Sequence, residues 1–545
     1  MSRVALVGPE IEENLSLRYL CSALARHGHQ TDIVAFNNDA DFAVAIETIL
    51  TAKPDVVGIS LAFQWRATDF LALAVALREK GYRGHITAGG HFATFASLEL
   101  LRDFPELDSI VRQEAEETIV ALVGAIGGGV PFDRVAGLAV RDESGVPRLN
   151  EHAMLPDLAT LPWPDRRGEP ASCFGHGIAP IVSSRGCYAN CSFCCIAAWH
   201  EQSLPGKRYR VREPDTVADE MLAMKRDRGV DIFVFHDDNF FVPGHRKNRE
   251  RFSALADALE RRNIGPFATV VKARPTDCDP EVFAILRNRL NCIRVYVGIE
   301  SDADQGLTTL QRWSTAKMNR KAIELVRSLD LYTCFNMLIF DPDTTLESLD
   351  TNIRFMRWAA EFPSNFGRVE LYAGTPLLAR MLAEGRCRGD WMQWDYSLAS
   401  PDVERVFGLA MRCFHARNFG EGALNNRIMA TRFDIEVCRH FHADLFRPAW
   451  LERGKELSRT LSLDTVRALS RIVDHVKHRP VDEDAALVPE LVPGLRAMES
   501  DISKAARELA TELATHLGRG HPLTDLGDRV ATPLQTPRSP AGAYG

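Results

Sequence analysis

The chain has 545 residues, of which 46% are hydrophobic and 25% charged, and its formal net charge is −8. This composition is typical of a globular protein with two to four domains of roughly 100–200 residues each. No apolar run reaches the ~18 residues that a membrane span needs, no basic stripe favours nucleic acid, and the first residues lack the apolar core of a secretory signal. We therefore expect a cytoplasmic protein that neither crosses a membrane nor binds nucleic acid.

Residues 1–140 alternate short apolar runs with amphipathic stretches, a pattern typical of a parallel sheet flanked by helices. Gly28 and Gly81 follow two of the helical stretches, at positions that favour helix C-termini. The sequence predicts an α/β domain, doubly wound and flavodoxin-like. Its strands are expected at residues 4–7, 31–36, 55–60 and 85–88.

The remaining chain divides into four predicted segments. Residues 141–172 carry five prolines and no periodicity, which indicates a linker. Residues 173–384 return to strand–helix alternation, and six units suit a partial barrel better than a closed one. Residues 385–517 show helical patterns without strands, and the proline-containing segment 518–545 is expected to be a flexible tail. The six barrel strands are predicted at 178–183, 231–236, 267–272, 292–297, 332–340 and 368–372.

Four of the 12 cysteines fall within nine residues, directly after the first predicted barrel strand. Cys187, Cys191 and Cys194 can ligate three corners of an iron–sulfur cubane and leave the fourth iron open. The alternatives are structural zinc, with His200 or Cys195 as a fourth ligand, and a chance cluster of buried cysteines. We assign Cys195 to packing.

The Cys-x3-Cys-x2-Cys run, with Phe193 before the third cysteine, is similar to the motif of the radical S-adenosylmethionine (radical SAM) superfamily. The resemblance covers roughly residues 178–380. It implies a 4Fe-4S cluster whose open iron binds SAM, and cleavage of SAM to a 5′-deoxyadenosyl radical. It also implies that Phe193 contacts the SAM adenine.

Further residues similar to SAM-binding positions of that family stand at predicted strand ends. Carboxylates suit an ammonium or ribose hydroxyls, and a cationic side chain suits a carboxylate. Acidic residues at strand ends are also common helix caps, and Arg274 could simply pair with Asp237 or Glu300. The segment 336–342 lacks the Gly-x-Pro-Gly-type turn common in the family. The candidate SAM residues are Asp237, Asp238, Lys272, Arg274, Glu300 and Ser301.

The N-terminal domain resembles the cobalamin-binding subgroup of the superfamily. Glycines at strand ends would let the backbone approach a planar ring closely. The Asp-x-His-x-x-Gly motif, whose histidine binds cobalt in many cobalamin proteins, is absent after the first strand, where residues 9–16 contain no histidine. A scaffold that has lost its corrinoid site is the alternative. The candidate cobalamin residues are Ser60, Leu61, Gly89, Gly90, His91 and Glu114.

Together the resemblances imply a cobalamin-dependent radical SAM methyltransferase that acts on an unactivated carbon, or phosphorus, of a small molecule, through methylcobalamin, in antibiotic or other natural-product biosynthesis. The substrate would lie between the two domains, and an external electron donor of flavodoxin or ferredoxin type would reduce the cluster. A monomer is compatible with the sequence, and no catalytic side chain is assigned. Trp391, Trp394 and Tyr396 either cover the cleft or pack in an ordinary core. The alternatives are cyclisation, rearrangement or oxygen insertion with the same cofactors, and a non-catalytic corrinoid sensor.

Overall fold

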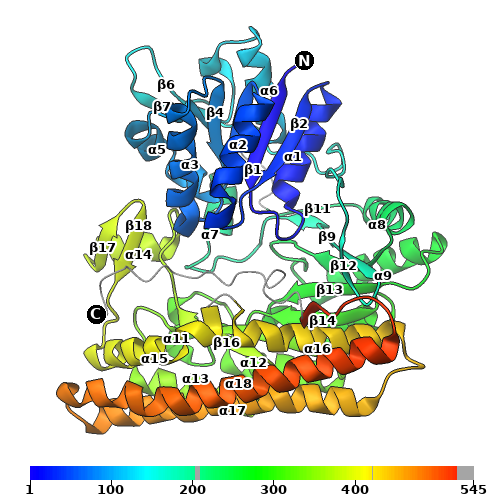
Figure 1. Cartoon of the computed structure of the whole chain (residues 1–545), viewed down its shortest axis with the longest axis vertical. Helices are drawn as coiled ribbons and strands as arrows, with labels where there is room; N and C mark the ends of the chain where they lie inside the picture. The colour runs from blue at the N-terminus through cyan, green and yellow to red at the C-terminus, as the bar shows by residue number, and fades with distance from the viewer. Residues whose placement is uncertain (203–208, 420–421, 525–545) are drawn as a thin grey trace.

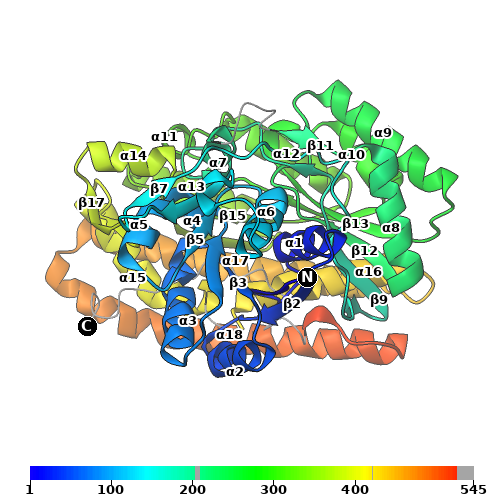
Figure 2. The ribbon, with the colours of Figure 1, turned by 90° about the horizontal axis from the view of Figure 1, so that it is seen from above.

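The computed structural model describes residues 1–202, 209–419 and 422–524 (Figure 1). The N-terminal domain lies on one side of a second sheet, and a layer of long helices lies on the other side. Seen from above, the N-terminal domain covers the middle of the molecule (Figure 2). No helix in the described ranges is long and apolar enough to cross a membrane.

The N-terminal sheet has seven strands in the order β2-β1-β3-β4-β5-β6-β7. The first five are parallel in the flavodoxin-like order 2-1-3-4-5, as predicted. Two antiparallel strands extend this sheet at one edge, and the second lies inside the predicted linker; Pro147 is tolerated there because an edge strand leaves its N–H side unpaired. The strands are β1 (Arg3–Gly8), β2 (Gln30–Ala35), β3 (Val56–Ser60), β4 (His85–Gly89), β5 (Ser109–Val111), β6 (Leu138–Arg141) and β7 (Pro147–Leu149).

Helices cover both faces of this sheet because each carries an apolar stripe. Leu17, Cys21 and Leu24 of α1 pack with Ile119 and Leu122 of α6 against one face. The side chain of Asn14 accepts a hydrogen bond from the Leu17 N–H and begins α1 directly after the β1 loop. The helices are α1 (Leu15–Arg26), α2 (Phe42–Ala52), α3 (Ala67–Glu79), α4 (His91–Phe95), α5 (Ser97–Asp103) and α6 (Glu116–Ile126).

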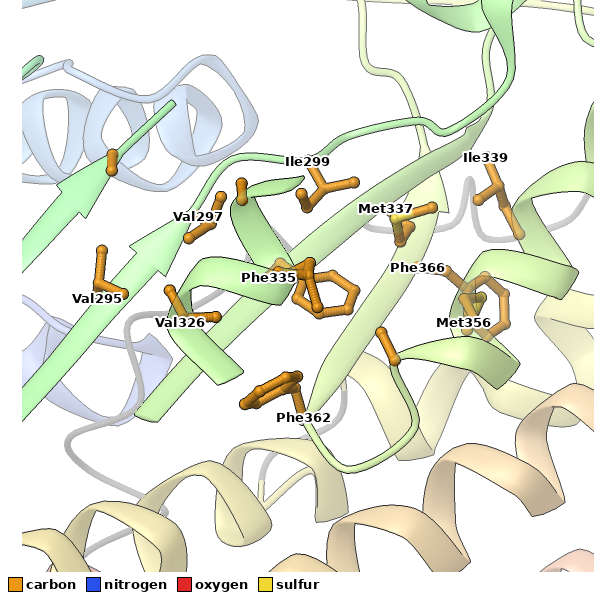
Figure 3. Packing of buried hydrophobic residues seen from close by; sticks show 14 of the residues in the cluster. Val295, Val297, Ile299, Val326, Phe335, Met337, Ile339, Met356, Phe362 and Phe366 are labelled. Atoms are coloured by element: carbon orange, nitrogen blue, oxygen red, sulfur yellow. The ribbon is translucent and has the colours of Figure 1, made fainter. Parts of the chain in front are cut away.

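The second sheet is the predicted partial barrel, with six parallel strands and one antiparallel edge strand, in the order β16-β15-β14-β13-β12-β9-β8. Its outward-facing side chains, among them Val295, Phe335 and Met337, pack with Val326 and Met356 from the covering helices (Figure 3). The strands are β8 (Ala171–Cys173), β9 (His176–Ile181), β12 (Val230–Phe235), β13 (Ala268–Ala273), β14 (Cys292–Val297), β15 (Tyr332–Phe340) and β16 (Ser364–Arg368).

The sixth barrel strand was predicted too late in the chain. β16 ends at Arg368, after which the chain leaves the sheet. Val369 and Leu371 produced the misleading strand-like pattern; they are buried in the core shared with the covering helices, not paired in a ladder. The covering helices are α8 (Pro214–Arg228), α9 (His245–Arg261), α10 (Pro280–Asn288), α11 (Asp304–Thr309), α12 (Ala316–Ser328), α13 (Leu346–Trp358) and α14 (Pro376–Ala383).

In the part of the chain that the structure describes, four α-helices follow the barrel: α15 (Pro401–Phe419), α16 (Leu424–Phe441), α17 (Pro448–His478) and α18 (Asp484–Leu517). α16 and α18 pack against residues near the N-terminal ends of the barrel strands, such as Ile293 and Tyr332. This arrangement leaves the C-terminal strand ends toward the N-terminal domain, where parallel sheets bind ligands.

The sequence predicted helices without strands after residue 385, and this prediction was wrong for the first residues of the segment. β17 (Cys387–Asp390) and β18 (Gln393–Tyr396) form an antiparallel hairpin before α15. The start of the predicted tail is also packed: Thr524 is buried and donates hydrogen bonds to Asp434. Residues 525–545 of that predicted tail lie outside the described residues.

Candidate active site between the two domains

A cavity of about 1750 Å³ lies between the C-terminal edges of the two sheets. Its walls come from strand ends of the N-terminal domain, from the barrel, and from the β17–β18 hairpin and α15. The cavity therefore brings together segments more than 300 residues apart in the sequence.

The cysteine loop connects β10 (Ser184–Arg185) to α7 (Cys195–Glu201). Two N–H donors converge on one of its sulfurs: the Ala189 N–H donates to Cys187 Sγ at 3.4 Å and the Asn239 amide to the same sulfur at 3.7 Å. Burial, reinforced by the neighbouring Cys195, Cys191 and Cys187, raises the pKa of Cys194. A set of thiols with converging N–H donors fits an iron–sulfur cluster, because such donors stabilise sulfur ligands in the thiolate form.

His200 does not turn toward these sulfurs, which disfavours it as a fourth zinc ligand. Its Nδ1 lies 3.8 Å from Glu114 Oε1, and its Nε2 lies 3.8 Å from Asp238 Oδ2. Cys195 lines the cavity beside Cys194, and burial raises its pKa to about 12.

Asp238 and Lys272 line the cavity beside the cysteine loop. The Gly186 N–H donates to Asp238 Oδ2 at 2.9 Å. Although burial opposes ionisation, hydrogen bonding and charge from His200 lower the pKa of Asp238. Burial lowers the pKa of Lys272, opposed by the nearby Asp238. A carboxylate and an ammonium group on one wall could hold the amino and carboxylate groups of SAM.

Asp237, the neighbouring SAM candidate, has a structural position. Its side chain is 1% exposed, does not line the cavity and accepts hydrogen bonds from the Ser183 N–H and hydroxyl and from the Ser184 hydroxyl. It therefore fixes the start of the cysteine loop, and Asp238 is the carboxylate that faces the cavity.

The other SAM candidates divide in the same way. Phe193 and Glu300 line the cavity, whereas Arg274 and Ser301 do not. Ser301 is fully buried and donates its hydroxyl to Asn352 at 3.2 Å, and Arg274 donates to the carbonyl oxygen of Arg312. Burial raises the pKa of Glu300, opposed by Arg312 and Arg274, and its backbone has a φ of +61°. Such a backbone conformation at a strand end is typical of a constrained functional site.

The N-terminal wall of the cavity is built largely from small residues at strand ends. Ser60, Gly89, Gly90 and His91 line it, whereas Leu61 is buried behind it and bonds to Gly89 through the backbone. Gly90 has a φ of +109°, and a Cβ there would lie 2.8 Å from the Ala62 nitrogen. At the two glycines the wall is backbone, which a flat ring can approach closely.

The cavity continues into the N-terminal domain, between its sheet and helices α1 and α6. Apolar side chains and one glycine form this channel, which suits the nucleotide tail of cobalamin. The channel residues are Leu6, Leu17, Leu20, Gly58, Val111 and Ile119.

The loop after β1 binds the barrel and offers no histidine to cobalt. Glu12 pairs with His236 at 3.2 Å, and Glu13 pairs with Arg166 at 2.5 Å and with Arg228 at 2.6 Å. His91 packs its ring against Trp199 of α7, with 4.9 Å between the ring centroids, and so lies at the junction of the two domains.

Glu114 lines the cavity, but its carboxylate is engaged by the barrel. Arg185 bridges Glu114 at 2.7 Å and Glu116 at 2.6 Å, and Arg210 also pairs with Glu114. Arg185 stands two residues before Cys187, with its guanidinium 4.7 Å from the ring of Tyr19. The predicted cobalamin residue Glu114 is thus also an anchor that ties the cysteine loop to the N-terminal domain.

The sequence did not reveal Gln64, Gln113 or Arg312. The Gln64 amide donates to the carbonyl of Met392 and accepts from the Ala373 N–H, so it joins the N-terminal domain to the β17–β18 hairpin. Gln113 has a φ of +62° and lines the cavity. These polar residues lie outside any motif, and only their tertiary contacts identify them.

The three aromatic residues of the hairpin region have different surroundings. Trp394 lines the cavity. Trp391 stacks on Phe92 of the N-terminal domain, and Tyr396 is buried and donates its hydroxyl to the Val369 carbonyl. One of the three therefore contributes to the cavity wall, and the other two are packing residues.

Comparison with known proteins agrees with this two-part site. Residues 3–123 match the B12 binding domain, and residues 181–356 match the radical SAM superfamily. An uncharacterized methyltransferase of Pyrococcus horikoshii, PH0819, is 23% identical over 71% of this chain and 78% of its own length. The anaerobic magnesium-protoporphyrin IX monomethyl ester cyclase of Cereibacter sphaeroides is 27% identical over 62% of this chain, but this match covers 55% of the cyclase.

Among solved structures, the cobalamin-dependent SAM radical enzyme OxsB, with aqua-cobalamin and SAM bound, has a TM-score of 0.65. The match has 17% sequence identity and covers 95% of this chain and 80% of OxsB. This likeness shows that the two chains share a fold. The two domain matches identify the chain as a cobalamin-binding radical SAM enzyme, with a 4Fe-4S cluster, SAM and cobalamin as its cofactors.

Proposed function

We propose that this enzyme is a methyltransferase that methylates an unactivated carbon, or phosphorus, of a small molecule in natural-product biosynthesis. The observation that supports this proposal is the shared cavity, onto which both the glycine wall at Gly89 and the cysteine loop at Cys194 open. In such a reaction SAM supplies the radical that activates the substrate, and cobalamin supplies the methyl group. The chain itself binds and orients the cofactors and the substrate, and it excludes water from the site.

A third wall of the cavity is available for the substrate. Phe366, Trp394, Phe407 and Met411 line it, from β16, the hairpin and α15. These side chains favour a largely apolar small molecule.

Two polar side chains in the same wall could orient the substrate. The amide of Asn365 is 2% exposed, and neither of its polar atoms has a hydrogen-bond partner among the described residues. Burial raises the pKa of Glu370, opposed by Arg368, which favours its protonated form. Both residues could therefore donate a hydrogen bond to a polar group of the substrate.

Anaerobic reconstitution tests the proposal. The protein is loaded with iron, sulfide and hydroxocobalamin and then given reductant and SAM, and we expect both 5′-deoxyadenosine and methylcobalamin to accumulate. A fully loaded protein that forms no 5′-deoxyadenosine would contradict the radical chemistry. 5′-Deoxyadenosine without methylcobalamin would contradict the methylation alone.

A second candidate is cyclisation, rearrangement or oxygen insertion with the same cofactors. The similarity to a cyclase supports it. The mass of the product separates the two: a gain of one CH2 group supports methylation, whereas loss of hydrogen, an unchanged mass or a gain of oxygen supports the alternatives.

A further inference from the structure

Arg312 lies in the loop between α11 and α12, and its side chain reaches the cysteine loop. The residue is 5% exposed. Its Nη1 donates a hydrogen bond to Cys191 Sγ at 3.2 Å, and its Nη2 donates to the carbonyl oxygen of Gly298. A guanidinium stays protonated throughout the accessible pH range, so a full positive charge adjoins this sulfur.

The loop around Arg312 is held in one conformation. Gln311 and Trp313, on either side, have φ values of +49° and +56°, a region that non-glycine residues rarely adopt. The Arg312 N–H bonds to the Leu307 carbonyl at 3.0 Å, and its own carbonyl accepts a hydrogen bond from Arg274. The guanidinium is therefore delivered to Cys191 by a constrained backbone.

The cysteine loop is tied to the same loop by a second residue. Ser192 donates its N–H to the Leu310 carbonyl at 3.0 Å and its hydroxyl to the Thr309 carbonyl at 2.6 Å. Ser192 thus keeps the Cys191 sulfur within reach of Arg312 without any contribution from the guanidinium. Removing the charge of Arg312 leaves these two bonds in place.

Arg312 differs from the other donors around the sulfurs because it is charged. Cys187, by comparison, accepts hydrogen bonds from the neutral N–H of Ala189 and the neutral amide of Asn239. Arg274 adds a second positive charge that acts on Cys187 at longer range, and Glu300 faces Arg312 with the opposite charge. The charges beside the cysteines therefore include two arginines and one glutamate, of which Arg312 is in direct contact with a cysteine sulfur.

We propose that Arg312 raises the reduction potential of the cluster bound by Cys187, Cys191 and Cys194. On reduction the cluster accepts one electron from an external one-electron donor and gains one negative charge. A fixed positive charge at hydrogen-bond distance from a ligand sulfur stabilises that reduced state more than the oxidised state. The inference concerns the cluster itself and holds whether the enzyme methylates or cyclises its substrate.

An EPR-monitored redox titration of the reconstituted holoenzyme, without SAM, tests this role. In Arg312→Gln we expect the ratio of reduced to oxidised cluster at a fixed potential to fall at least tenfold, which is a shift of 59 mV to lower potential for one electron. Iron and sulfide content are measured on the same sample. Arg327→Gln is the matched control, because this arginine pairs with Glu361 on the outer surface of α12.

Two further variants separate charge from structure. Arg312→Lys keeps the charge, and we expect its reduced-to-oxidised ratio to stay within about threefold of the wild type. Glu300→Gln removes the opposing charge and should shift the potential upward. A fully loaded Arg312→Gln variant with the wild-type reduction potential would overturn the proposal. A reduction potential that is lowered as much in Arg312→Lys as in Arg312→Gln would also overturn it. If Arg312→Gln fails to hold a cluster, an unchanged potential in Glu300→Gln overturns it instead.

Discussion

The two main walls of the cavity differ in chemical character. The barrel wall carries charges, with Asp238, Lys272 and Glu300 at successive strand ends. The N-terminal wall presents backbone at Gly89 and Gly90, beside the larger side chains of His91 and Glu114. Charges of both signs suit a zwitterionic ligand, whereas exposed glycine backbone suits the close approach of a large flat ring. Substitutions on the barrel wall should therefore weaken binding of the cluster or SAM, and substitutions on the N-terminal wall should weaken binding of cobalamin.

The largest effect is expected at the cluster itself. Cys191→Ala should lose the cluster and all detectable 5′-deoxyadenosine formation, because two remaining thiolates leave the cubane underligated. Cobalamin binding should persist, since that wall is separate. Iron content measures the loss of the cluster, and the cobalamin absorption spectrum measures cobalamin binding. Cys195→Ala is the control and should keep its cluster; loss of the cluster in that variant as well would contradict our choice of ligands.

The next largest effect is expected where the two walls meet. Glu114→Gln removes the negative charge that Arg185 and Arg210 share, and breaking a buried ion pair on one side costs about 3–5 kcal/mol. We expect Glu114→Gln to unfold at a lower denaturant concentration than the wild type and to bind less iron and sulfide on reconstitution. The neighbouring Glu117 is exposed, so Glu117→Gln should behave as the wild type. Equal stability of the two variants would show that the ion cluster does not hold the domains together.

On the barrel wall, Asp238→Asn should weaken SAM binding about 10- to 100-fold, because a hydrogen bond to a charged group contributes about 1.5–3 kcal/mol. Isothermal titration with the loaded protein measures this affinity. Asp237→Asn is an instructive companion: it should lower stability through its lost contacts with Ser183 and Ser184 while SAM affinity stays near the wild-type value. Should Asp237→Asn weaken SAM binding as strongly, the assignment of the two carboxylates is wrong.

The smallest effect is expected in the channel of the N-terminal wall. A Cβ at Gly58 would approach Leu6 Cδ2 to 2.8 Å, so Gly58→Val should narrow the channel and weaken cobalamin binding about tenfold, or ~1.4 kcal/mol. SAM cleavage should be unaffected. In Gly124→Ala the added Cβ meets nothing within 4 Å, which makes it the control. If Gly58→Val binds cobalamin as tightly as the wild type, the channel is not part of the cobalamin site.

Much of the architecture could be predicted from local pattern. Apolar alternation located five of the six parallel barrel strands, and two of them, β14 and β15, to the residue. β16 was misplaced because buried residues outside the ladder imitate a strand. The β17–β18 hairpin was missed because each of its strands has only four residues, and the pairing of such short segments depends on the partner strand.

The sequence by itself located the predicted cluster site, because Cys187, Cys191 and Cys194 lie within eight residues and their spacing is a local property. The tertiary structure alone decided which strand-end residues face the cavity, for instance Asp238 and not Asp237. It also decided that Glu114 meets Arg185 and that Arg312 reaches Cys191, 121 residues away. Spacing along the sequence does not predict such contacts, because the packing of whole helices and strands brings these side chains together.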